Sequence, residues 1–306
     1  MSDATELRRP PDAVVAAAAA RAADGDPGGA AAHVVVADPA VDGDAALEDG
    51  RYEGPDAVAC GHLAAALAVA DATSGVRLHH GDVDPTVEGP WLVLAPLDGQ
   101  IATVATGTAT ATVTVPIDEP ARTRSVRARL DAVLAAARAR HDHYPVADDD
   151  RGVFRTGMTT FSFREAIRDD GTLRVRFDVS TTPATTRGEI VGRFASLSDG
   201  GDAAGGHVEF ETSDVAIDVA FEAGVERADP SVGLRDAVEA AHRSVVGDAG
   251  YEWLPRPTVF SRLPSMEKVA FGGGRPGDRF DGDDFERTRA LLERITERVS
   301  DREGRS

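Results

Sequence analysis

The sequence predicts an α/β protein whose first domain is interrupted by a second, α+β domain. Short apolar, β-branched runs alternate with alanine- and leucine-rich helical segments near the start of the chain. The middle of the chain changes to strictly alternating strands, and the first pattern then returns. The chain has 306 residues, which is long enough for two domains, and 42% of them are hydrophobic, which is enough to build a core.

The first part of the chain predicts alternating helices and buried strands. Prolines begin an alanine-rich helix at residues 11–23, where a missing N–H costs little. Residues 34–36 and 91–95 are uninterrupted apolar runs, as in strands that are buried on both faces. Residues 61–72 are apolar on nearly every side, so we expect a buried helix there.

The middle of the chain predicts a small sheet with two helices. Apolar residues alternate with polar ones along each strand, so we expect Phe161, Phe163 and Ile167 to belong to the buried face of one strand. The order β-α-β-β-α-β is that of a ferredoxin-like, split βαβ domain. The expected elements are a strand at 110–117, a helix at 126–137, strands at 161–167 and 173–179 joined by a Gly-Thr turn, a helix near 186–197, and a strand that ends at 221.

The α/β pattern returns in the last part of the chain. We therefore predict an α/β domain built from residues 1–107 and 224–306, with the α+β domain inserted at residues 108–223. The returning elements are a helix at 234–245, a strand at 269–271 and a closing amphipathic helix at 285–299.

The charge balance restricts the partners of this chain. Lys and Arg number 33 against 52 Asp and Glu, a formal charge of -19. Phosphate contacts need clustered cations, so we expect neither a nucleic-acid binder nor an anionic-membrane binder. Lys268 is the only lysine, and this acidic, arginine-rich composition indicates either a protein adapted to concentrated salt or a GC-rich genome. No signal peptide or membrane span is evident, so we expect a cytoplasmic protein.

Few motifs in the chain carry chemistry by themselves. Cys60 is the only cysteine, which excludes a disulfide framework, and we expect a buried structural thiol. The glycines of residues 272–277 match G-x-G-x-x-G, but no second parallel strand is expected after them, as a dinucleotide site requires. Histidines cluster only at 79–80 and 141–143. The adjacent pair at 79–80 projects to different sides, which disfavours a shared metal. The pair at 141–143 lies at the end of a predicted helix, and no second cluster supports a metal there.

A family resemblance begins at residues 48–58, which read EDGRYEGPDAV and precede Gly61 and an alanine–leucine helix. This stretch resembles the segment dGrlyGrGavDaKGplAa of the zinc-dependent aminoacylase, carboxypeptidase and deacylase family. That family includes acetylornithine deacetylase, succinyl-diaminopimelate desuccinylase and carrier-protein-lysine hydrolases. The resemblance implies a split, zinc-exopeptidase-like α/β domain with an inserted ferredoxin-like lid. It extends through residues 34–43, 93–107, 174–183 and 269–274.

The resemblance covers the framework but not the metal ligands. The family holds two zinc ions with two histidines, a bridging aspartate and two further carboxylates, and a glutamate is the general base. Here Ala37 matches the first histidine, Pro39 its supporting aspartate, Ala59 the bridging aspartate and Ala95 a further carboxylate. The paired glutamates, the C-terminal histidine and the lid histidine have no clear match. Zinc needs three or four converging donors, which alanine and proline side chains do not supply.

The leading prediction is therefore a catalytically inactive relative that binds or regulates and carries no cofactor. By the resemblance it pairs as a homodimer, or as a heterodimer with an active paralogue, through residues 108–223. A second hypothesis is an active zinc-dependent hydrolase of N-acyl amino acids or peptides with a rearranged site. Its donors would come from His33, His62, Asp38, Asp56, Asp82, Asp84 and Glu88. A third is a small-metabolite binder that holds a carboxylate through Arg164, Arg174 or Arg176.

Overall fold

The computed structural model divides the chain into two compact units, and each is described by itself. Unit 1 consists of Met1–Ala105 and Arg227–Ser306, and unit 2 of Thr106–Glu226. None of the described helices is long and apolar enough to cross a membrane. The structure describes residues 9–24, 32–38, 43–73, 75–81, 83–84, 86–117, 123–138, 143–144, 157–169, 171–182, 185–195, 197, 215–223, 228, 230–254, 258–263, 267–277 and 279–303.

Unit 1 is built on a six-stranded sheet. In order across the sheet, the strands are β13 (Tyr251–Leu254), β6 (Ile101–Ala105), β14 (Lys268–Phe271), β5 (Trp91–Leu94), β1 (Ala32–Val36) and β4 (Val76–His79). The last four strands run parallel to one another, and β6 is antiparallel to β14. Every residue of β1, β5 and β14 is buried, as expected for parallel strands that are covered on both faces.

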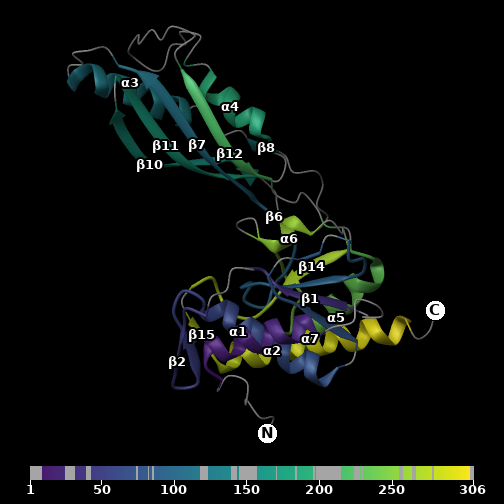
Figure 1. Ribbon diagram of the computed structural model, residues 1–306. Helices are drawn as coiled ribbons and strands as arrows, with labels where there is room; N and C mark the ends of the chain where they lie inside the picture. The colour runs from purple at the N-terminus through teal and green to yellow at the C-terminus, as the bar shows by residue number, and fades with distance from the viewer. Residues whose placement is uncertain are drawn as a thin grey trace. The chain divides into compact units, whose positions relative to one another are not determined.

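Four helices share a hydrophobic core with this sheet. They are α1 (Pro11–Ala23), α2 (Ala57–Ala72), α5 (Val232–Val245) and α7 (Gly282–Glu303). Figure 1 shows α1, α2 and α7 lying together along one side of the sheet. Unit 1 also contains a short helix, α6 (Val259–Arg262), and a small sheet of β15 (Arg279–Phe280), β3 (Arg51–Glu53) and β2 (Ala46–Glu48).

Unit 2 is a four-stranded antiparallel sheet with two helices. In order across the sheet, the strands are β10 (Thr160–Asp169), β11 (Thr172–Thr181), β7 (Gly107–Pro116) and β12 (Ala216–Glu222). Helix α3 (Thr123–Arg138) follows β7, and α4 (Arg187–Ala195) follows β11. Both the chain order and the spatial order are those of a ferredoxin-like domain, which confirms this part of the predicted fold class. A two-residue pair, β8 (His143–Tyr144) with β9 (Gly157–Met158), lies between α3 and β10 in the chain.

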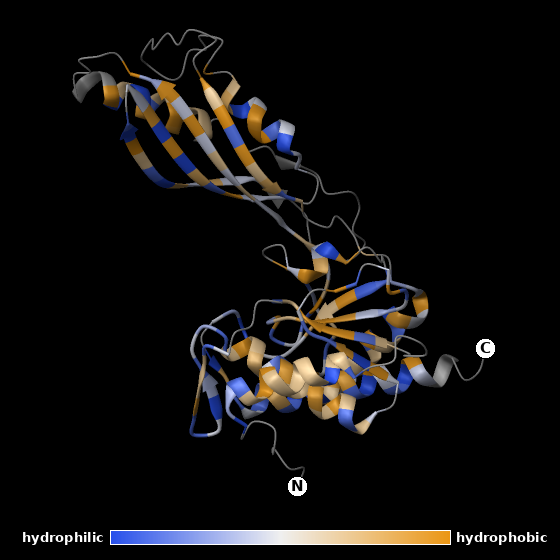
Figure 2. Ribbon diagram, in the orientation of Figure 1, coloured by the Kyte–Doolittle hydropathy of each residue, from blue (hydrophilic) through white to orange (hydrophobic). Residues whose placement is uncertain are grey.

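Alternating side chains separate the two faces of the sheet in unit 2. Hydrophobic and hydrophilic residues alternate along its strands, as Figure 2 shows. In β7 the alternation is regular: alanines and valines are buried, while the threonines between them are partly exposed. The apolar face of the sheet and the apolar sides of α3 and α4 form one core. The opposite face of the sheet carries the polar side chains.

A β-bulge changes the predicted orientation of one side chain in β10. Phe163 lies opposite Phe177, but Glu165 lies opposite the next residue, Arg176, so one residue of β10 is extra. Phe163 therefore faces the same side as the buried Phe177, whereas Ile167 lies opposite Arg174 on the polar face. Ile167 is 43% exposed. The expectation that Ile167 belongs to the buried face is wrong, because the bulge reverses the alternation between residues 163 and 165.

Gly61 allows α2 to lie close against the ring of Phe280. A β-carbon at Gly61 would overlap this ring, which is fully buried. We expect Gly61→Ala to lower the free energy of unfolding of unit 1 by about 1–3 kcal/mol, because the ring must leave its packed position. Gly192 in α4 is the matched control, since a β-carbon there meets nothing within 4 Å. Gly192→Ala should stabilise its helix by about 0.5–1 kcal/mol. Urea denaturation measures both, and effects of the same sign would contradict this packing.

Candidate functional site

Buried alanines occupy the carboxyl ends of two parallel strands in unit 1, the edge at which open α/β sheets bind ligands. Ala37 directly follows β1, and its backbone N–H donates to the carbonyl of Leu94 at 2.8 Å. The carbonyl of Ala37 accepts the N–H of Val259 at 3.0 Å. Ala95 directly follows β5, is fully buried, and donates its N–H to the carbonyl of Phe271 at 2.9 Å. Neither residue has a side-chain donor, and both backbones are hydrogen-bonded within the fold.

His62 lies on α2 and is buried next to the turn that follows β14. Its Nε2 lies 3.0 Å from the carbonyl oxygen of Gly273, which can only accept, so Nε2 carries the proton. The ring packs edge-on against Phe280 with centroids 5.3 Å apart. Burial lowers the pKa of His62 to about 4, so the ring is neutral at neutral pH. This histidine is a packed, hydrogen-bonded core residue.

The glycine motif forms a turn that is bound within the protein. The N–H of Gly273 donates to Thr288 Oγ1 at 2.8 Å, and the N–H of Gly274 donates to Asp284 Oδ1 at 3.0 Å, both on α7. A β-carbon at Gly272 would come within 2.5 Å of the carbonyl oxygen of Ala95. Two N–H groups that a dinucleotide phosphate would need therefore bond protein atoms, and the glycines allow close packing.

His33 lies on β1 and forms a hydrogen-bonded pair with His79 at the end of β4. The Nδ1 atom of His33 lies 3.0 Å from Nε2 of His79, and Nε2 of His33 lies 3.1 Å from the carbonyl oxygen of Glu88. Both rings pack against Trp91, with centroid distances of 5.0 and 4.7 Å. The pairing of His33 with His79 is not evident in the sequence, because it depends on β4, a strand that the residue pattern does not reveal.

The remaining candidate donors do not converge with these histidines. Asp56 Oδ2 accepts the N–H groups of Gly43 and Asp44, both at 3.0 Å. Asp84 is exposed and accepts the N–H and hydroxyl of Thr86, which lowers the pKa of its carboxyl. Within the described ranges no group of three or more His, Cys, Asp or Glu side chains could hold a metal ion. Asp38 and Glu88 are exposed, Ala59 is half-buried on α2, and Asp82 and Pro39 lie outside the described residues.

Cys60 and the second histidine cluster add no further site. Cys60 is a buried free thiol on α2, and burial raises its pKa to about 12, so it is not a thiolate at neutral pH. This agrees with the structural thiol expected from the sequence. His143 forms part of β8, and His141 lies outside the described residues.

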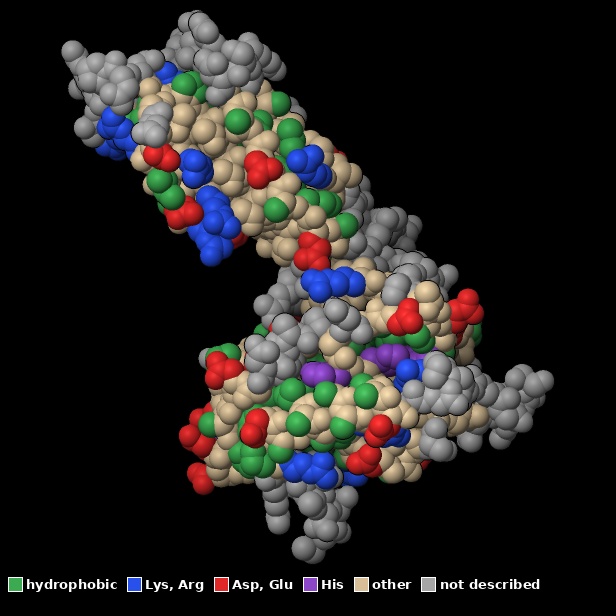
Figure 3. Space-filling model, in the orientation of Figure 1, with side chains coloured by type: hydrophobic (Ala, Val, Ile, Leu, Met, Phe, Trp, Pro, Cys, Tyr) green, Lys and Arg blue, Asp and Glu red, His purple; other side chains and the backbone are tan. Residues whose placement is uncertain are grey.

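Two of the three candidate arginines on unit 2 have carboxylate partners. Arg164 Nη1 lies 2.9 Å from both carboxylate oxygens of Asp178, and Arg176 Nη1 lies 3.7 Å from Glu165. Acidic and basic side chains are interspersed on the visible face of this unit, as Figure 3 shows. Arg174 is exposed on β11. The first two cations are therefore neutralised within the unit, and the structure does not gather the three arginines around one cavity.

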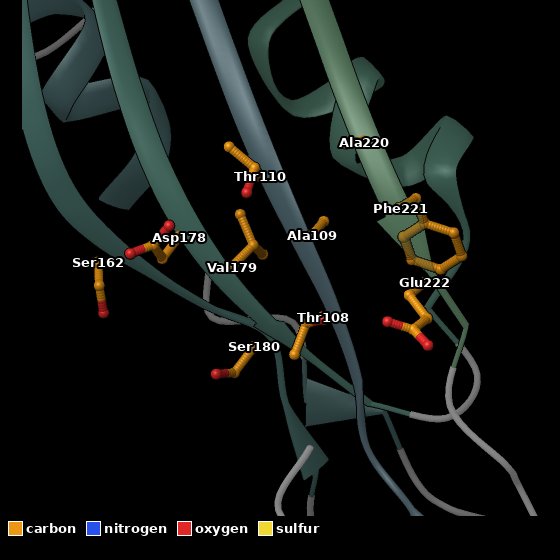
Figure 4. A pocket seen from close by; sticks show the side chains of 10 residues that line it. All are labelled: Thr108, Ala109, Thr110, Ser162, Asp178, Val179, Ser180, Ala220, Phe221 and Glu222. Carbon is orange, nitrogen blue, oxygen red and sulfur yellow. The ribbon is translucent and has the colours of Figure 1, made fainter. Parts of the chain in front are cut away.

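The polar face of unit 2 contains a hollow of about 490 Å³. Figure 4 shows hydroxyl and carboxylate side chains from β7, β10, β11 and β12 around it. None of the three candidate arginines lines it, although Arg164 bonds one of its carboxylates. The polar lining residues are Thr108, Thr110, Ser162, Asp178, Ser180 and Glu222.

Comparison with solved structures identifies the fold. Neither a protein-family model nor a curated protein matches the sequence. Human carnosine dipeptidase 1 superposes with a TM-score of 0.58 at 11% identity, over 90% of this chain and 82% of that one. The M20 family metallo-carboxypeptidase Sso-CP2 from Sulfolobus solfataricus superposes with a TM-score of 0.56 at 12% identity, over 88% of this chain and 85% of that one. The Bacillus subtilis YXEP protein, a dinuclear metal-binding peptidase of the M20 family, superposes with a TM-score of 0.54 at 10% identity, over 89% of this chain and 81% of that one. These matches confirm the predicted fold, that of the M20 peptidases.

The described residues do not fit a dinuclear metal centre like the one named for the YXEP protein. Two metal ions need several converging N or O donors. Here the ends of β1 and β5 carry alanine, and the rings of His33 and His62 bond different protein partners. No reaction step is therefore assigned to a metal in this chain.

Proposed function

We propose that this protein is a non-catalytic relative of the M20 peptidases that acts by binding or regulation. The observation that supports it best is the pair of buried alanines at the ends of β1 and β5. In the family that the sequence resembles, these positions hold metal ligands. A methyl group there gives a metal no electron pair.

The two buried histidines support the same proposal. The ring of His62, on α2, donates a hydrogen bond to the carbonyl of Gly273. The ring of His33, on β1, is bonded to the ring of His79 and to the carbonyl of Glu88. To bind a metal, His33 would have to give up a buried hydrogen bond, because both of its ring nitrogens are bonded, and a group left unpaired costs about 1–3 kcal/mol. His62 could offer Nδ1 without losing its bond, but among the described residues it belongs to no group of three or more metal-binding side chains. Without a bound metal, no water is acidified and no carbonyl is polarised, so amide hydrolysis by the family's chemistry would not proceed.

Metal analysis distinguishes this proposal from the active alternative. We expect protein purified from zinc-supplemented medium to contain far less than one zinc ion per chain. It should not hydrolyse N-acyl amino acids or dipeptides when zinc, cobalt or manganese is added. Plasma mass spectrometry and a ninhydrin assay for released amine measure the two quantities. Stoichiometric metal together with hydrolysis would overturn the proposal and support a hydrolase with a rearranged site.

We also propose that unit 2 carries the surface through which this protein pairs with a second subunit. Strand β10 is at the edge of its sheet and pairs only with β11 among the described strands. Two large apolar side chains are exposed on it, Phe163 at 51% and Ile167 at 43%. A long edge with exposed apolar side chains is a template for pairing with another strand.

Light scattering after size exclusion tests the pairing. We expect a dimer, either of this chain or with a co-expressed active paralogue, and we expect Ile167→Lys to raise its dissociation constant at least about tenfold. Val232→Lys is the matched control, because Val232 is 69% exposed in unit 1. Monomers at every salt concentration, with no co-purifying partner, would contradict the proposal. Equal effects of the two variants would exclude β10 as the contact.

A further inference from the structure

The segment that joins β4 to β5 is bound to the sheet through a histidine. Because β4, β1 and β5 run parallel, the chain must return along the sheet between β4 and β5. Residues 86–90 complete this return and are called the return segment here. The N–H of His33 donates to the carbonyl of Pro90 at 3.0 Å, and the ring bonds the carbonyl of Glu88 at 3.1 Å. Gly89 lies so close that a β-carbon would be 3.1 Å from the ring.

The two hydrogen bonds of His33 fix the tautomers of the pair. The carbonyl of Glu88 can only accept, so Nε2 of His33 carries a proton. In the neutral ring, Nδ1 then has a free lone pair and accepts from Nε2–H of His79. The bonds thus form a directed chain from His79 through His33 to Glu88. The remaining nitrogen, Nδ1 of His79, is the one free to take the first added proton.

Charged groups from two segments surround the pair. Asp84, ahead of the return segment, favours a proton on His79, whereas Arg77 on β4 opposes charge on both rings. Trp91 on β5 packs against both rings and is fully buried. Lys268 lies beside Trp91 in the sheet register, and its Nζ donates to the carbonyl of Leu263. Burial lowers the pKa of both histidines, that of His79 to about 4, so the pair is neutral at neutral pH.

We propose that the pair of His33 and His79 is an acid-sensitive latch that holds the return segment on the sheet. One proton can be added on Nδ1 of His79 without breaking the bond between the rings. A second proton must go to Nδ1 of His33, which then presents an N–H to the N–H of His79 across 3.0 Å. Two cationic rings in this arrangement repel each other, so the ring of His33 turns away and releases the carbonyl of Glu88. The return segment then opens while the rest of unit 1 stays folded.

Acrylamide quenching of Trp91 measures the opening directly. The chain has two tryptophans, so Trp253→Phe leaves Trp91 as the only emitter. We expect its quenching constant to rise at least about threefold as pH falls from 7.5 to below 4, because His79 takes the first proton near pH 4 and the buried ring becomes accessible only after the second. Far-UV circular dichroism should stay constant over the same range. The latch would be overturned if the quenching constant of Trp91 stayed the same, or if it rose together with loss of the circular dichroism signal.

Two variants separate the latch from a general effect of acid. In His33→Gln the amide N–H can still donate to Glu88 but does not titrate, so the rise in quenching should be lost. His242 is another buried histidine of unit 1 and bonds Val238 within α5, so His242→Gln should keep the rise. A rise that persists in His33→Gln overturns the proposal. If that variant does not fold, NMR of the unsubstituted protein decides, since the latch requires His33 to hold its proton on Nε2 and the pair to titrate in two coupled steps.

Discussion

Gly273→Ala is expected to lower the free energy of unfolding of unit 1 by about 3 kcal/mol or more. A β-carbon at this position would lie 2.6 Å from the backbone carbonyl of Asp284 and 2.9 Å from Thr288 Oγ1. Both atoms belong to α7, so relief requires the turn to move away from the helix. That movement breaks the bond from the Gly273 N–H to Thr288 and the one from the His62 ring to the Gly273 carbonyl. The loss of two buried hydrogen bonds adds to the steric cost.

Gly277→Ala is the matched control for this effect. Gly277 belongs to the same motif, but a β-carbon there would approach nothing closer than the Arg275 carbonyl at 3.9 Å. We expect its free energy of unfolding to stay within about 0.5 kcal/mol of the unsubstituted protein. Urea denaturation measures both variants, since a shift in the midpoint at an unchanged m-value is a change in the free energy of unfolding. If Gly273→Ala were as mild as Gly277→Ala, the close packing of the turn on α7 would be incorrect.

Acid is expected to destabilise unit 1 between pH 6.5 and 4. In the unfolded chain a histidine takes a proton near pH 6.5, whereas burial lowers the pKa of His62 to about 4 in the folded state. Over this window the unfolded state binds more protons, so the free energy of unfolding falls as pH falls. For the fully buried His62 alone the loss reaches about 3 kcal/mol by pH 4. Asp284 acts in the opposite sense, because burial raises the pKa of its carboxyl.

The variant His62→Gln isolates this contribution. Its amide can donate to the Gly273 carbonyl but has no proton to gain in this range. We expect urea midpoints measured from pH 7 to pH 4.5 to fall less steeply in the variant than in the unsubstituted protein. Parallel curves would mean that His62 is not the group whose protonation opposes folding.

Much of the fold follows from local pattern. Helix α1 has the bounds that its prolines and alanines predict, and the strands predicted at 34–36 and 269–271 lie within β1 and β14. Strands β4, β6 and β13 are not evident, because each has only four or five residues and mixes polar with apolar ones. The bulge in β10 is also hidden, since an extra residue in a strand leaves no mark on the composition.

The candidate site, like the fold, could be predicted from the sequence only in part. That Ala37 and Ala95 occupy strand ends could be predicted, because both follow apolar runs that the sequence marks as strands. The bonds that hold His33 and His62 could not, since each joins residues that are far apart in the chain. Long-range pairing of this kind depends on strand order, which residue spacing alone does not determine.

The burial of Lys268 has a consequence for how this protein can be handled. It carries the only lysine amine of the chain, and the residue is 2% exposed, with its amine bonded to the Leu263 carbonyl and packed over the ring of Phe260. Amine-reactive ester dyes and lysine-cleaving proteases therefore find no lysine side chain on the native surface. Labelling of Lys268 therefore requires the amine to leave its buried site, and the rate of labelling measures how often unit 1 opens around the start of β14.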